Sequence, residues 1–175
     1  EEVAEMGMAT ESLANYPELV TLPCYEWQHE LVMPRDHPLA NSRQISLARL
    51  AECPLVTYPP SFTGRSRIDR AFEQQGLKTH IALEAIDSDV IKTYVSLGLG
   101  IGILAKMAFD PEQDRNLRAM DASHLFESST TRIGIPRKAY LRGYIYDFIE
   151  MFAPQLSRKV VDDAVHGKPK LDYDM

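Results

Sequence analysis

The 175-residue sequence lacks the features by which several protein classes are recognised. Its two cysteines, Cys24 and Cys53, are too few for a disulfide framework, and no Cys-x-x-Cys motif offers metal or redox chemistry. The five histidines are scattered without ligand spacing, so neither a metal nor another cofactor is expected. No run of about eighteen apolar residues occurs, which argues against a membrane span. The first residues also lack the basic and apolar regions of a signal peptide.

Catalytic motifs are also missing. The sequence contains no G-x-S-x-G elbow, no P-loop and no H-E-x-x-H. The glycines of Gly98–Gly102 follow an expected helix and precede an expected strand, the reverse of a dinucleotide-binding loop. Glu11 and Glu26 are acids, but no spacing brings them together. We therefore interpret the chain as a binding protein and not an enzyme.

The composition is that of a globular protein, with 45% hydrophobic and 25% charged residues. The net charge of −6 argues against a surface that coats nucleic acid, because clustered Lys and Arg make phosphate contacts. Short strands and helices alternate between Pro- and Gly-containing breaks, which predicts an α/β fold with a largely parallel sheet. The expected helices are Ser46–Glu52, Arg65–Gln75, Asp87–Leu97, Tyr140–Phe152 and Leu156–Val165. The expected strands are Leu19–Leu22, Trp27–Met33, Pro54–Tyr58, His80–Ile86, Ile101–Leu104, Leu117–Met120 and Thr131–Ile135.

The segment from Tyr58 to Ser66 carries the strongest local signal for a ligand. It places Ser61, Thr63, a glycine and an arginine where a helix begins, and free backbone N–H groups at a helix start favour an anion. A simple helix cap is an equally good reading. A second polar stretch, Met8–Ser12, is more readily explained as a cap. Trp27, the single tryptophan, is either ordinary core or the wall of a cleft.

Several motifs together resemble the effector domain of one branch of the LysR-type transcriptional regulators, the CysB/Cbl branch. The resemblance covers the chain from about Met8 to about Val165, and F-T-G-R-S and D-V-I-K-T-Y-V are its most specific motifs. The motifs are Ala9-Thr10-Glu11, Leu22-Pro23-Cys24-Tyr25-x-Trp27, Pro54-Leu55-Val56-Thr57-Tyr58, Phe62-Thr63-Gly64-Arg65-Ser66, Asp89-Val90-Ile91-Lys92-Thr93-Tyr94-Val95 and Ser129-Thr130-Thr131.

This resemblance implies a type 2 periplasmic-binding-protein-like fold, in which two α/β lobes are joined by two crossover strands. Residues 1–29 and 127–175 are expected to form the first lobe, and residues 30–126 the second. In this family a winged helix-turn-helix and the opening strand of the first lobe precede this region. We therefore expect the DNA-binding domain to be absent from this chain and the first lobe to be partial, with about ten residues absent between Met6 and Gly7, judged by usual strand length.

The resemblance also implies a function. The chain is expected to be the inducer-binding domain of a cytoplasmic regulator of cysteine biosynthesis and sulfur assimilation. N-acetylserine, O-acetylserine, sulfate or thiosulfate would bind in the cleft between the lobes, and promoter DNA would bind the missing domain. The implied oligomer is a dimer of effector domains within a tetramer. The implied ligand residues are Thr10, Glu11, Tyr25, Trp27, Ser61, Phe62, Thr63 and Gly64.

Three alternatives stay open at this point. One is a Cbl-like regulator of sulfonate use or sulfate starvation. Another is a secreted solute-binding protein for sulfate or an amino acid. The third is an enzyme acting on acylated serine, for which the sequence shows no nucleophile and base.

Overall fold

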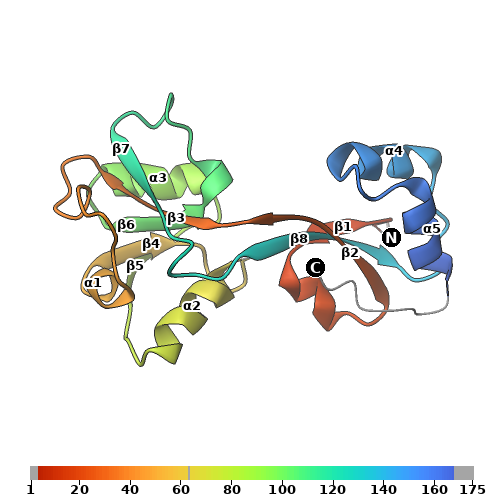
Figure 1. Ribbon diagram of the computed structural model, residues 1–175, viewed down its shortest axis with the longest axis horizontal. Helices are drawn as coiled ribbons and strands as arrows, with labels where there is room; N and C mark the ends of the chain where they lie inside the picture. The colour runs from red at the N-terminus through yellow and green to blue at the C-terminus, as the bar shows by residue number, and fades with distance from the viewer. Residues whose placement is uncertain (1–3, 63, 168–175) are drawn as a thin grey trace. The chain divides into compact units, whose positions relative to one another are not determined.

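The computed structural model describes residues 4–62 and 64–167. It divides the chain into two compact units, which are coloured along the chain in Figure 1. Unit 1 contains the residues up to Glu26 and those from Thr130 onward, and unit 2 is Trp27–Ser129. The chain leaves unit 1 along β2 (Leu19–Trp27) and returns along β8 (Ser129–Pro136).

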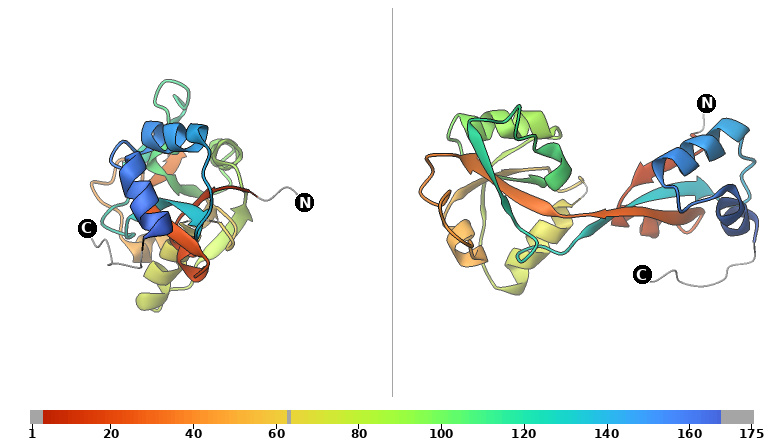
Figure 2. Two further views of the ribbon diagram at one scale, coloured as in Figure 1. Left: turned by 90° about the vertical axis from the view of Figure 1, so that its right-hand side faces the viewer. Right: turned by 45° about the horizontal axis from the view of Figure 1, so that its top comes forward.

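The described part of unit 2 is built on a five-stranded sheet of order β5-β4-β6-β3-β7 (Figure 2). These strands are β3 (His29–Pro34), β4 (Pro54–Thr57), β5 (His80–Glu84), β6 (Ile101–Ala105) and β7 (Leu117–Asp121). β4 is parallel to β5 and β6, whereas β3 is antiparallel to both β6 and β7. The prediction of a largely parallel sheet is therefore wrong, because only β4, β5 and β6 are linked by the helical crossovers that parallel pairing needs.

Helices cover both faces of this sheet (Figure 1). α1 (Leu47–Ala51) and α2 (Arg65–Gln74) pack on one face, and α3 (Ser88–Ser96) on the other. Along β3, Leu31 and Met33 belong to the first core cluster, and Val32 between them packs with Ile91 and Val95 of α3. Because successive side chains of a strand point to opposite faces, one apolar strand supplies both cores.

The helix ends follow the capping signals in the sequence. The Ser46 hydroxyl accepts a hydrogen bond from the Arg49 amide at 3.3 Å, and the Asp87 carboxylate accepts one from the Asp89 amide at 2.7 Å. Gly98, after α3, has φ +76°, the left-handed conformation of a helix C-terminus. The glycines after it lead into β6, as expected, and form no dinucleotide-binding loop.

Unit 1 has a three-stranded sheet within its described residues, of order β1-β8-β2, in which β1 (Gly7–Ala9) is antiparallel to β8. α4 (Gly143–Phe152) and α5 (Arg158–His166) supply Ile145, Ile149 and Val161 to a core shared with Val20 and Ile133 of the strands. The short 3-10 helix η1 (Glu11–Asn15) follows β1, and a second, η2 (Lys106–Ala108), follows β6 in unit 2. No helix of the described residues is long and apolar enough to cross a bilayer.

The boundary of β2 differs from the prediction. The sequence predicted one strand over Leu19–Leu22 and another over Trp27–Met33. β2 instead runs without a break through Pro23 to Trp27. Among the described residues, β2 is an edge strand of the unit 1 sheet. A proline is tolerated on an edge strand, because its missing N–H can lie on the side that has no partner strand.

Candidate ligand-binding site

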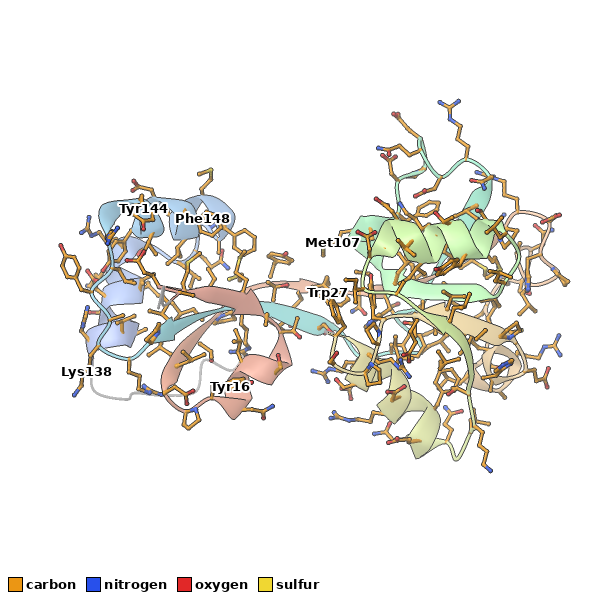
Figure 3. All side chains as sticks on the ribbon, turned by 180° about the vertical axis from the view of Figure 1, so that it is seen from behind. Tyr16, Trp27, Met107, Lys138, Tyr144 and Phe148 are labelled. Carbon is orange, nitrogen blue, oxygen red and sulfur yellow. The ribbon has the colours of Figure 1, made fainter. Side chains whose placement is uncertain are left out.

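Trp27 lies at the point where the chain enters unit 2. It is the last residue of β2, it is half-buried, and Figure 3 labels it. Its ring centroid is 5.0 Å from that of His29, with the two planes inclined at 58°. Trp27 belongs to none of the three apolar clusters found among the described residues. Trp27 therefore packs on His29 outside these clusters, and its role in lining a cleft stays a prediction.

The loop before α2 packs directly against this aromatic pair. Gly64 is the N-cap of α2 and has φ +84°. A Cβ atom at Gly64 would lie 2.8 Å from Nε2 of His29 and 2.9 Å from Cη2 of Trp27. His29 is fully buried, and its ring meets Phe126 edge-on at 5.6 Å. Both the backbone conformation and the space therefore require glycine, which holds the loop against Trp27.

The start of α2 has no side-chain cap hydrogen bond and no acidic residue in its first turn, so no acid of that turn offsets the positive end of the helix dipole. Its first-turn arginines, Arg65 and Arg67, pair with carboxylates from other positions. The amide of Arg65 bonds the carbonyl of Phe62 at 3.2 Å, and that of Arg67 bonds Gly64 at 3.2 Å. Ser61 and Phe62 are exposed in the loop just before the helix. This arrangement can attract an anionic group beside an aromatic wall.

Arg65 does not add a free charge to the site. Its side chain is buried, with Nε on Asp69 at 2.7 Å and Nη1 on Glu84 at 2.6 Å. The same Nη1 donates to the carbonyl of Tyr58 at 2.6 Å. Burial acts to lower the pKa of Arg65, but the hydrogen bonds to Glu84 and Asp69 outweigh it and the pKa is raised. Arg65 therefore ties α2 to the end of β4 and to β5.

The predicted ligand residues of unit 2 are only partly brought together. Trp27 and Gly64 are in contact, as described above. Phe62 stacks on Tyr58 with ring centroids 6.4 Å apart, in the same loop as Ser61. Thr63, predicted to supply the ligand hydroxyl, lies outside the described residues.

The remaining predicted residues belong to unit 1. Thr10 is 4% exposed and occupies the N-cap position of η1 without a side-chain cap hydrogen bond. Glu11 begins η1. Tyr25 is 39% exposed, and its ring meets that of Phe152 edge-on at 5.4 Å. β8 separates β1 from β2, so Thr10 and Tyr25 are not on neighbouring strands.

His29 is the residue of this site that the sequence reasoning missed. The five histidines were considered only as metal ligands, and none of them pairs at ligand spacing. One signal in the sequence could have identified His29. It lies two residues after Trp27 in an expected strand, and side chains two residues apart in a strand point to the same face.

Both cysteines are free thiols in surroundings that disfavour the thiolate. Burial raises the pKa of the Cys24 thiol and that of the Cys53 thiol above the ordinary value. Each Sγ lies 3.6 Å from a backbone carbonyl oxygen, that of Leu22 and that of Arg49 respectively. A thiol with a raised pKa is a poor nucleophile at neutral pH. Within the described ranges, no cluster of His, Cys, Asp or Glu could hold a metal ion.

Two α/β units joined by β2 and β8 form a two-lobed α/β domain. The chain belongs to the LysR substrate binding domain family, whose model matches residues 3–157. The family and the periplasmic-binding-protein-like fold that the sequence motifs implied are thereby confirmed.

The similar proteins are transcriptional regulators by name. The chain is 53% identical over 154 residues to the HTH-type transcriptional regulator SsuR of Burkholderia cenocepacia, covering 88% of this chain and 50% of that protein. It is 49% identical over 165 residues to CysB of the same organism, covering 94% and 53%. The solved cofactor-binding domain of the Cbl transcriptional regulator superposes with a TM-score of 0.88 at 42% identity, covering 94% of this chain and 72% of that one. The chain spans about half the length of the curated relatives it matches.

Proposed function

We propose that this chain is the effector-binding domain of a LysR-type transcriptional regulator of sulfur assimilation, and that its effector is a small anion of the N-acetylserine, O-acetylserine, sulfate or thiosulfate class. The identity of 49% with CysB over nearly the whole chain supports the proposal most strongly. The start of α2 beside Trp27 adds a physical reason, because it favours a negative group next to an aromatic surface.

The ligand roles follow from chemistry. The carboxylate or sulfate group would sit at the amide end of α2 with the hydroxyls of Ser61 and Thr63, and the indole of Trp27 would cover the ligand's apolar part. Thr10, Glu11 and Tyr25 stay predicted ligand residues of unit 1. An anion beside a carboxylate is unfavourable, so Glu11 would accept a hydrogen bond from an N–H or hydroxyl of the ligand.

The effector would act by shifting a conformational equilibrium. A ligand changes the populations of two states only by its difference in affinity for them, so N-acetylserine must bind one arrangement of the regulator better. In the whole protein, which we propose is a cytoplasmic homo-oligomer, that change would reach a DNA-binding domain. The names of the three relatives favour regulation over the transport and enzyme alternatives.

A second candidate is a Cbl-like role in sulfonate use or sulfate starvation, which the similarity to the solved Cbl domain supports. The two roles differ in the expected effector. A response to acetylserines favours the CysB-like role, and a response to sulfate alone favours the Cbl-like role.

The single tryptophan makes the test direct. Titration with N-acetylserine, O-acetylserine, sulfate and thiosulfate should give a saturable change in Trp27 emission with at least one of them. Thr63→Val should raise the Kd about tenfold or more, because it removes one hydroxyl hydrogen bond to a charged group. Thr93→Val is the matched control, since its hydroxyl bonds the Asp89 carbonyl within α3 at 2.8 Å. Equal affinities of the two variants would remove Thr63 from the site.

A further inference from the structure

A second recess lies in unit 2 between β7 and the segment that leads into α1. Its volume is about 870 Å³, well within the range that small-molecule sites occupy and far larger than one inorganic anion needs. It is lined by Leu31, Asn41, Ser42, Arg43, Gln44, Ile45, Arg118, Ala119, Met120, Asp121 and His124. Trp27, His29 and Gly64 do not contribute to it.

The floor of this recess is apolar and fixed. Leu31 of β3 is fully buried and Ile45 is 2% exposed, and both belong to the core cluster that also packs against α1 and α2. Met120 of β7 is half-buried against the same cluster. Nε2 of His124 lies 2.9 Å from the carbonyl oxygen of Ile45 and holds the two walls together. Leu31 and Ile45 therefore close the floor from beneath, and the half-buried Ala119 and Met120 supply the apolar surface that a ligand can touch.

The rim of the recess is cationic. Arg43 and Arg118 line it from its two sides, and both side chains are exposed. Among the described residues, no carboxylate pairs with either guanidinium. The one acid of the lining, Asp121, accepts hydrogen bonds from the backbone and hydroxyl of Ser123. Two guanidiniums therefore face one carboxylate that is already hydrogen-bonded.

We propose that this recess is a second ligand site, which binds an organic carboxylate with an apolar body. A guanidinium recognises a carboxylate through paired hydrogen bonds, and the half-buried Ala119 and Met120 offer the apolar surface against which the body of the ligand would pack. Inorganic sulfate would leave the floor uncovered and bind more weakly. The site stands apart from the effector site proposed above, because it shares no residue with it.

Benzoate is the probe, with benzamide as its neutral counterpart of the same shape. In the whole 175-residue chain labelled with ¹³C at the methionine methyls, benzoate should move the Met120 resonance saturably, while the emission of Trp27 stays constant. The Met120 signal is assigned by its loss in Met120→Leu. Benzamide should bind at least about tenfold more weakly, because it lacks the charge that the arginines recognise.

Variants that remove one charge test whether Arg43 and Arg118 bind the carboxylate of benzoate. Arg43→Gln and Arg118→Gln should each raise the Kd for benzoate about tenfold or more, and Arg70→Gln, an exposed arginine of α2, should not change it. These three surface changes leave the core intact, and thermal unfolding of each variant checks that. No saturable Met120 shift, equal binding of benzamide, or equal effects of the three variants would each overturn the proposal. A benzoate response seen in Trp27 alone would place the anion at the effector site and also contradict it.

Discussion

Replacing Gly64 with alanine adds a single methyl group inside the candidate effector site. The added methyl group enters the space 2.8 Å from Nε2 of His29 and 2.9 Å from Cη2 of Trp27. His29 is fully buried and Trp27 half-buried, so neither ring can swing freely into solvent. The residue also stays at φ +84°, where a side chain costs about 1–2 kcal/mol.

Gly76→Ala separates these two costs. Gly76 has φ +64°, similar to Gly64, but nothing lies within 4 Å of the position its Cβ would take. Gly76→Ala should therefore lower the free energy of unfolding by the backbone cost alone, about 1–2 kcal/mol. Gly64→Ala adds the displacement of two rings, about 1–3 kcal/mol for overpacking, and should cost about 2–5 kcal/mol in total.

Urea unfolding of the two variants measures both costs, and Trp27 emission in the native state reports the local change. Gly64→Ala should shift the native emission, because its methyl meets the indole, and Gly76→Ala should leave it as in the parent. If Gly64→Ala costs no more than Gly76→Ala and leaves the emission unchanged, the loop does not pack against Trp27 and the geometry of the site is refuted.

Three further predictions concern charge and burial in the two units. Arg65→Met should lower the free energy of unfolding in urea by about 1–3 kcal/mol, because the carbonyl of Tyr58 loses its buried donor while the exposed carboxylate of Glu84 can be solvated by water; a loss below about 0.5 kcal/mol would contradict this. Glu30→Gln should raise the melting temperature at pH 7, because burial raises the pKa of Glu30 and disfavours its charged form. That gain should disappear below about pH 4, where the carboxyl is protonated in both folded and unfolded chains, and an equal gain at pH 3 and pH 7 would exclude the electrostatic cause. Cys24 in the folded protein should react with a thiol reagent at pH 7.5 more than about tenfold slower than in urea, because its thiol is buried and its pKa is raised; equal rates would show that the thiol is accessible.

Much of unit 2 could be predicted from local chemistry. Ser46 and Asp87 cap their helices as their side chains suggest, and Gly98 takes the left-handed conformation that ends α3. The family could be recognised from short motifs such as F-T-G-R-S. These signals are local in the chain, so a sequence displays them.

The errors arose where tertiary context decides. The strand predicted to end at Leu22 continues through Pro23 to Trp27, because a proline is tolerated where β2 forms an edge of the described sheet. The antiparallel pairing of β3 depends on which strands the helical crossovers join. The sequence places Arg65 at the start of a helix but does not show its ion pairs, one with Asp69 a turn further along α2 and one with Glu84 of β5.

The contact between Gly64 and His29 could not be read from the sequence either. It joins the end of β2 and the start of β3 to a loop that follows β4, and only the folded sheet brings these segments together. The glycine itself was noted as part of a motif. Its physical reason is the lack of room for a Cβ atom beside two rings.

The central claim is that the domain binds a small sulfur-assimilation effector at the site beside Trp27. Thermal unfolding with graded N-acetylserine, O-acetylserine, sulfate and thiosulfate tests it most directly. At one hundred times its Kd a ligand that binds only the folded state adds about 2.7 kcal/mol, so the melting temperature should rise by several degrees with at least one of the four. The rise should be reduced in Thr63→Val and kept in Thr93→Val. An unchanged melting temperature with all four compounds would contradict the account.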